Sequence, residues 1–302
     1  MSPRPDRDST ALRPLALSQG LLSRADGSAQ FAFGNVAVLA SVTGPAEVRI
    51  RDELVDRATL EINLRPLRGQ GGPHLKAAEA TLAALLAPLI LLHLYPRALL
   101  QLTLQTISLP STTFATAFST DPALALAAAN ADAKGKGKAK GPTGAGVGAA
   151  EKAARINAAM MALVDGGVQT RGMLVAVAVA FVPLDDDDDD DDDEMRLDPT
   201  PQEELDAAST HVFAFSFGQG VGGAEGTCVG IDSVGTFSED QLFDAQDLAQ
   251  SAAQTMLAFI RRSVETKYGL AGEAPPPARV QQRDATDEVA GVDDDDRVMI
   301  DA

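Results

Sequence analysis

Hydrophobic and polar residues alternate with a period of two in several short stretches of the chain. Leu100, Leu102 and Leu104 alternate with polar residues over 99–107, and three phenylalanines alternate with small residues over 211–217. This period places every second side chain on one face of a strand. The same reasoning predicts a strand or irregular arm over 13–22 and strands over 29–33, 36–43, 47–50, 59–64, 173–182 and 227–233.

Glycine and proline positions divide these strands into hairpins. Turns at 24–28 and 34–35 flank the stretch 29–33, which predicts a hairpin with 36–43. The pair Gly44–Pro45 is expected to break the second of these strands. A second hairpin is predicted from 211–217 and 227–233, with a glycine-rich loop between them.

Three stretches show the composition or spacing of helices. The first, 75–92, is rich in alanine and leucine, with Pro88 marking a break near its end. In the second, apolar residues from Ile156 to Leu163 recur at helical spacing until Gly166 and Gly167 end the helix. In the third, Ser238 and Gln241 form a capping box for an amphipathic helix that reaches about residue 267 and ends at Gly269.

Three other stretches lack any apolar periodicity. Residues 119–152 are dominated by alanine, glycine and lysine, and residues 185–194 hold nine consecutive aspartates and one glutamate. Residues 273–302 begin with a proline run and are acidic. We therefore predict one domain over 12–272 with disordered insertions at about 119–152 and 185–195, a flexible N-terminus over 1–11, and a disordered acidic tail over 273–302.

The overall composition is that of a folded protein outside membranes. The chain has 302 residues, 45% of them hydrophobic, which is enough for a sizeable core. Neither of the two longest apolar runs approaches the roughly 20 residues that a membrane span needs, no secretory signal is recognisable, and the single cysteine, Cys228, fits a reducing compartment. The net charge of −18 lies almost entirely in the aspartate run and the tail, so the folded part is nearly neutral.

Several residue patterns resemble binding or catalytic motifs. Gly218, Gly220 and Gly223 have the spacing of a dinucleotide-binding loop, but they lie between two predicted strands, so a hairpin loop is favoured. The three histidines and Cys228 lack the spacing of metal ligands, and neither a metal nor a cofactor is predicted. One basic, glycine-rich connection precedes the first predicted helix, where it could hold an RNA backbone or could be an ordinary solvated loop; its cations are Arg65, Arg68 and Lys76.

The order of these elements, with several short motifs, resembles the RNase PH family, and within it the ring subunits of the RNA exosome. The matching pieces are 26–29 (DGSA), 44–45 (GP), 95–97 (YPR), 156–167 (INAAMMALVDGG) and 197–204 (LDPTPQEE). The resemblance implies an α+β RNase PH fold, with two β-α halves whose mixed sheets pack around central helices. It also implies a six-membered ring, other RNase PH-like subunits and a cap protein as partners, single-stranded RNA in a channel, and a location in nucleus, nucleolus and cytoplasm.

Active members of this family carry arginines in the motif G-R-S-L-R-A of the first helix, and carboxylates near the scissile bond. The corresponding stretch here, 82–87 (LAALLA), holds no cation. Asp198 is the only retained candidate acid, because the later family acid is replaced around 208–210 and neither Glu203 nor Glu204 is in its place. The resemblance therefore implies a degenerate phosphorolytic site.

Three functions remain open at this point. The first is a non-catalytic exosome ring subunit that supports 3′-to-5′ RNA processing, including that of ribosomal RNA, and RNA degradation. The second is an active phosphate-dependent 3′-to-5′ exoribonuclease that uses Asp198. The third is a free homodimer that binds RNA or DNA through Arg65 and Arg68.

Overall fold

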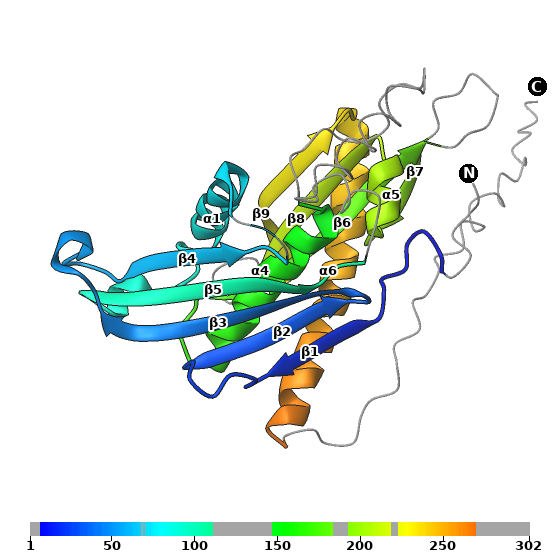
Figure 1. The fold of residues 1–302 in the computed structure, drawn as a ribbon. Helices are drawn as coiled ribbons and strands as arrows, with labels where there is room; N and C mark the ends of the chain where they lie inside the picture. Colours follow the sequence, from blue (N-terminus) through cyan, green and yellow to red (C-terminus); the bar gives the residue numbers. More distant parts are fainter. Residues whose placement is uncertain are drawn as a thin grey trace, which may run out of the picture.

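The computed structural model describes residues 7–67, 69, 71–110, 147–183, 193–218 and 223–269. Within these ranges two β-sheets enclose helix α4, Ala149–Asp165, and helix α6, Glu239–Lys267, packs along the second sheet (Figure 1). The α+β class and the central helix agree with the fold that the sequence predicted. No helix of the described part of the chain is long and apolar enough to span a bilayer.

The first sheet contains five strands that all precede α4. They are β1 (Leu15–Gln19), β2 (Gly27–Phe33), β3 (Val36–Glu47), β4 (Thr59–Arg65) and β5 (Ala98–Ser108), in the spatial order β1-β2-β3-β5-β4. Neighbouring strands are antiparallel except β4 and β5, which are parallel. A parallel pair requires a crossover connection, and helix α1, Pro73–Leu86, lies within that connection. Two short 3₁₀ turns, Ile50–Asp52 and Leu92–Leu94, complete this half.

The second sheet contains four antiparallel strands that all follow α4. They are β6 (Met173–Pro183), β7 (Asp193–Leu197), β8 (Ser209–Gly218) and β9 (Gly223–Gly235), in the order β7-β6-β8-β9. The short helix α5, Pro201–Asp206, connects β7 to β8. All residues of β6 and β8 are buried except Met173, Pro183 and Gly218, which requires cover on both faces of the sheet.

The structure corrects two predictions about the end of the first hairpin. Gly44 and Pro45 do not end the strand, because β3 continues to Glu47 and its pairing with β5 shifts register between Thr43 and Ala46. A bulge of this kind accommodates a proline that cannot donate to the ladder. The strand predicted over 47–50 was also wrong, since only Glu47 belongs to a strand and Ile50 begins a 3₁₀ turn.

The boundaries of two predicted loops also differ. The central helix begins at Ala149, so the last residues of the stretch 119–152 are helical, and β7 begins at Asp193, so the last residues of 185–194 are in a strand. Residues 119–146 and 185–192 lie outside the described residues. The capping box of α6 is confirmed: Ser238 accepts from the backbone N–H of Gln241, whose side chain accepts from the backbone of Ser238.

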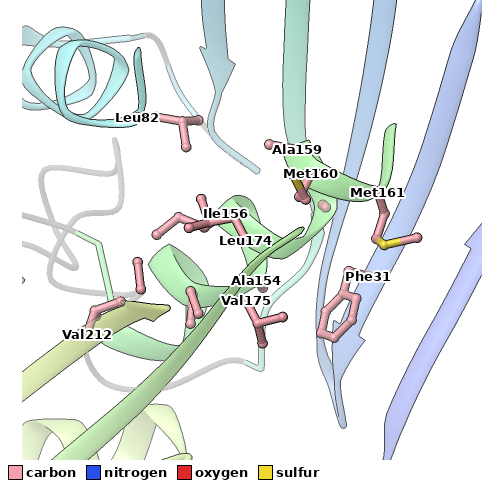
Figure 2. Close-up of a cluster of buried hydrophobic side chains, with 14 of the residues drawn as sticks. Phe31, Leu82, Ala154, Ile156, Ala159, Met160, Met161, Leu174, Val175 and Val212 are labelled. Atoms are coloured by element: carbon pink, nitrogen blue, oxygen red, sulfur yellow. The ribbon is translucent and has the colours of Figure 1, made fainter. Parts of the chain in front are cut away.

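Helix α4 is buried on almost all sides, because fourteen of its 17 residues are buried. It is rich in alanine, and these small side chains allow both sheets to approach it closely. Figure 2 shows Met160 and Met161 of α4 together with Phe31 of β2, Val175 of β6 and Val212 of β8. The sheets and the central helix therefore share one hydrophobic core.

The polar residue Asn157 fixes the position of α4 on β6. The side-chain amide of Asn157 donates to the carbonyl of Ala176 at 2.8 Å and accepts from its N–H at 2.7 Å. Strand β7 pairs only with Val179–Pro183, so it does not reach Ala176. The fully buried Asn157 therefore takes the place of a strand partner.

Candidate functional site: a cavity under helix α1

The main candidate site is a cavity of about 320 Å³ where the two sheets meet. Helix α1 lies beside β9 at this place (Figure 1). Its walls come from β4, α1, α4, β8 and β9: Leu64, Ala78, Thr81, Leu82, Ala84, Leu85, Lys152, Arg155, Ile156, Val212, Ala214 and Val229, Gly230, Ile231, Asp232. Most of these side chains are apolar, and the three charged ones are Lys152, Arg155 and Asp232.

The stretch 82–87, which the sequence analysis matched to the phosphate-binding motif of active relatives, contributes three residues to this cavity. Leu82, Ala84 and Leu85 line it, and Leu86 points into the core with no exposed surface. Leu85 packs directly on β9, because a Cβ added to Gly230 would lie 2.4 Å from its Cδ2 atom. The helix therefore offers the cavity methyl groups where a phosphate site needs donors.

Two cations reach the cavity from α4, and the sequence analysis did not single them out. The Nζ atom of Lys152 lies 2.8 Å from the Oδ2 atom of Asp232 on β9. The buried Arg155 donates through Nη2 to the Oε1 atom of Glu151 at 2.6 Å, and the same carboxylate accepts from the hydroxyl of Thr106. Each cation is thus neutralised by a carboxylate of the same domain.

The sequence contains a local signal for one of these ion pairs, that of Glu151 and Arg155. Glu151 and Arg155 are four residues apart, the spacing at which opposite charges attract on one helix face. The alanine-rich surroundings obscure this signal, because they lead to the prediction of a disordered insertion over 119–152. The partner of Lys152, Asp232, comes from a strand 80 residues away, and no local pattern predicts that pair.

The retained acid Asp198 holds the N-terminal segment. Its carboxylate accepts hydrogen bonds from the backbone N–H of Arg13 at 2.9 Å and from the Nε and Nη2 atoms of the same arginine at 2.8 and 2.5 Å. The Nη1 atom of Arg7 lies 3.5 Å from the Oδ2 atom of this carboxylate. Asp198 is 1% exposed and is not among the residues that line the cavity. Its observed contacts are those of a structural ion pair.

Glu203 and Glu204 on α5 have separate structural contacts. Glu203 completes a capping box with Thr200 and pairs with Arg196. Glu204 reaches the beginning of α4, where its Oε1 atom accepts from the backbone N–H of Ala150 at 2.8 Å. Gly148, the residue before α4, has no side chain to cap the helix, and a Cβ there would lie 2.3 Å from the Oε2 atom of Glu204.

The environment of Glu204 favours its neutral form. Burial raises the pKa of its carboxyl group from 4.5 to about 7, and the nearby carboxylates of Glu151 and Asp198 add to this effect. The hydrogen bond from Ala150 and the charge of Arg13 act in the opposite direction and are outweighed. Glu204 is therefore a titratable group at the beginning of the central helix. Its contact with Ala150 was not predicted from the sequence.

The histidines and the cysteine show no metal site. His211 is fully buried between the hydroxyls of Ser209 and Ser233, at 3.0 and 2.8 Å, and burial lowers the pKa of its imidazole to about 4. Cys228 stands in β9 as a free thiol. Among the described residues no group of three histidine, cysteine or acidic side chains could hold a metal ion.

The predicted RNA-binding connection is described only in part. Arg65 is exposed at the end of β4, Arg68 lies outside the described residues, and Lys76 lies in the first turn of α1, 2.8 Å from Glu79. The second oxygen of Glu79 accepts from the backbone N–H of Leu64. These contacts connect β4 to α1, and RNA binding by the three cations stays a prediction.

Gly218 and Gly223 pair across the hairpin of β8 and β9, which agrees with the predicted loop, while Gly220 lies outside the described residues.

Comparisons with known proteins agree with this fold. Residues 11–169 match the family model of the 3′ exoribonuclease family, domain 1. The chain is 31% identical over 246 residues to exosome complex component RRP46 of Saccharomyces cerevisiae, covering 82% of this chain and 93% of that protein. It is 35% identical over 101 residues to exosome complex exonuclease RRP46 homolog of Oryza sativa, covering 33% of this chain and 42% of that protein.

A solved structure shows the same fold. The crystal structure of rice Rrp46 superposes with a TM-score of 0.63 at 23% identity, and the match covers 86% of this chain and 98% of that one. The family match covers more than half of the sequence, and the yeast relative is matched over nearly its whole length. The chain therefore belongs to the RNase PH family of 3′ exoribonucleases and their relatives.

Proposed function

We propose that this chain is a non-catalytic RNase PH-like ring subunit of an RNA exosome. In this role it forms part of the barrel around a channel for single-stranded RNA and supports 3′-to-5′ RNA processing and degradation. The proposal draws on the yeast relative, an exosome complex component of which this chain covers 93%. Other RNase PH-like subunits and a cap protein are the expected neighbours, and nucleus, nucleolus and cytoplasm are the expected locations.

The absence of catalysis rests on the charge balance of the cavity under α1. Phosphorolysis requires cationic donors that hold the attacking phosphate and stabilise the negative charge of the transition state. Lys152 and Arg155 are the two cations in the lining, and each is already paired with a carboxylate at 2.8 and 2.6 Å. A phosphate ion would have to compete with Asp232 and Glu151 for these cations, although the buried Nη1 atom of Arg155 has no hydrogen-bond partner in the described part of the chain.

The experiment is co-assembly with the other ring subunits, followed by native mass measurement. A complex that contains one copy of this chain per ring supports the proposal, and a ring that forms without it contradicts it. The assembled complex is then incubated with 3′-labelled RNA in two parallel reactions, one with and one without inorganic phosphate. We expect no phosphate-dependent release of nucleoside diphosphates from sites on this subunit.

One observation favours the alternative of an active phosphorolytic enzyme. The rice relative is named an exosome complex exonuclease, and Lys152 keeps a cation at the rim of the cavity, 27% exposed. If phosphorolysis occurs here, Lys152→Gln must abolish the release of nucleoside diphosphates, while Lys76→Gln on the exposed surface of α1 must not. Release that shows this pattern would overturn the non-catalytic proposal.

A further inference from the structure

The cavity under α1 combines apolar walls with two cationic side chains of one helix. Leu82, Leu85 and Ile156 belong to the apolar walls, and both Lys152 and Arg155 reach the cavity from α4. Residues three apart lie on the same face of a helix, so these two cations are neighbours. Pockets that bind small molecules have this composition, in which apolar walls surround a few polar groups that fix the orientation of the ligand.

The two cations have more donors than described acceptors. The ammonium group of Lys152 has three N–H groups, and its described partner is the carboxylate of Asp232. The Lys152 side chain is 27% exposed, so its other donors are accessible to a ligand. Arg155 is 5% exposed, and its Nη1 atom has no hydrogen-bond partner in the described part of the chain. Because unpaired buried donors are costly, an oxygen acceptor beside α4 is favourable.

The carboxylates that pair with these cations disfavour an anionic ligand. Asp232 and Glu151 lie 2.8 and 2.6 Å from the nitrogen atoms of Lys152 and Arg155. An anion would therefore be attracted by two cations and repelled by two carboxylates, and its transfer from water to apolar walls is costly. A carbonyl oxygen accepts a hydrogen bond and brings no net charge into the cavity.

The volume of the cavity limits the size of the ligand. Its 320 Å³ correspond to about ten water molecules at the volume that water has in the liquid. A molecule of roughly ten non-hydrogen atoms has a comparable size. The cavity is therefore suited to a small molecule with a single ring and one short substituent.

We propose that the cavity under α1 binds an uncharged, mainly apolar molecule of roughly ten non-hydrogen atoms that carries one carbonyl group. The carbonyl oxygen accepts a hydrogen bond from Lys152, and the apolar part packs against Leu82 and Leu85. The proposal goes beyond the proposed function, which assigns no small-molecule ligand to this chain. It does not depend on ring assembly, because all walls of the cavity belong to one chain.

Three probes that share a benzene ring test the chemistry of the site. Acetophenone carries a neutral carbonyl group, ethylbenzene lacks the oxygen, and benzoate is an anion. Each probe is titrated into the full chain, and the methyl chemical shifts of Leu82, Leu85 and Ile156 report binding. We expect a dissociation constant on the order of 1 mM for acetophenone, and binding about tenfold weaker for the other two probes. Failure of acetophenone to bind, or equal or tighter binding of ethylbenzene or benzoate, would overturn the proposal.

Two pairs of variants locate the binding site. Ala78→Phe adds a ring to the lining and should weaken acetophenone binding at least tenfold, whereas Ala80→Phe, at an exposed position of α1 outside the lining, should not. Lys152→Met keeps the length of the side chain and removes its donors. Acetophenone should then bind only as tightly as ethylbenzene does, while Lys76→Met, at a position outside the lining, should retain the difference. An acetophenone affinity that Lys152→Met leaves unchanged would overturn the proposal, even if Ala78→Phe failed to fold.

Discussion

The carboxyl group of Glu204 gives the most direct quantitative prediction, because its pKa of about 7 lies well above its ordinary value of 4.5. The perturbation is Glu204→Gln, which keeps an oxygen that can accept from Ala150 and removes the titratable proton. Asp206→Asn is the matched control, since it removes one carboxylate from the same short helix, α5.

The sign and size of the effect follow from proton linkage. The folded state holds the Glu204 proton more tightly than the unfolded state, so the associated stability is fully present below pH 4.5 and is lost as the pH rises through 7. A shift from 4.5 to about 7 corresponds to about 3 kcal/mol. The free energy of unfolding of the wild type, relative to Glu204→Gln, should therefore fall by about 1.4 kcal/mol per pH unit between these values.

The assay is urea unfolding of both proteins at pH 5, 6, 7 and 8. The quantity to compare is the difference between wild type and Glu204→Gln at each pH, because other groups titrate in the same range. His211 is one of them, with a pKa lowered to about 4, so its contribution is lost as the pH falls. That contribution is common to both proteins and cancels in the difference.

The difference in unfolding free energy between the two proteins must change with pH by more than about 0.5 kcal/mol, the size of ordinary surface effects. A constant difference from pH 5 to 8 would refute the raised pKa of the Glu204 carboxyl group. The Asp206→Asn control reports the effect of removing a carboxylate from α5 while the contact between Glu204 and Ala150 is kept. If both variants changed the pH profile equally, the cause would be the net charge of α5 and not the contact with the beginning of α4.

Two further predictions concern contacts of α4. Asn157→Ala leaves the backbone N–H and carbonyl of Ala176 without their partners and should lower the free energy of unfolding by about 2 to 4 kcal/mol, measured by urea denaturation; a loss below 1 kcal/mol would show that these groups find other partners. Gly27→Ala places a Cβ 2.3 Å from the backbone nitrogen of Gly166 and should lower the melting temperature strongly, whereas Gly71→Ala, whose Cβ would meet only Leu75 at 3.6 Å, should not. Equal melting temperatures for these two alanine variants would contradict the close contact of β2 with the end of α4.

Local patterns in the sequence were sufficient for most strands and for α6. The alternation at 99–107 and 211–217 reflects side chains that face opposite sides of a sheet, and it required no knowledge of neighbours. The capping box at Ser238 likewise depends on residues only three positions apart. These features were predicted because the residues that produce each of them lie within a few positions of one another in the sequence.

The features that were missed depend on contacts between distant segments. Gly44 and Pro45 stay in β3 because pairing with β5 tolerates a shift of register. Glu204 contacts Ala150 across 54 residues, and Lys152 meets Asp232 across 80. For Asp198, family resemblance identified an important residue, yet the structure shows it bound to Arg13. The sequence alone shows that the stretch 82–87 contains no cation. It does not show that Lys152 and Arg155 of α4 are each paired with a carboxylate, because these pairs form only in the folded protein.

The strands of the first sheet precede α4 in the chain and those of the second sheet follow it, so the ribosome makes the first sheet before the helix that covers it. All strands of the first sheet lie before residue 109, while the helix that covers its apolar face ends at Asp165. A ribosome that adds about 5 to 20 residues per second needs roughly 3 to 11 s for that interval. During these seconds Phe31 and Val38, which are fully buried in the finished protein, have no helix to cover them. The apolar face of the first sheet is therefore exposed until α4 has been made, and a longer insertion between β5 and α4 would extend this period.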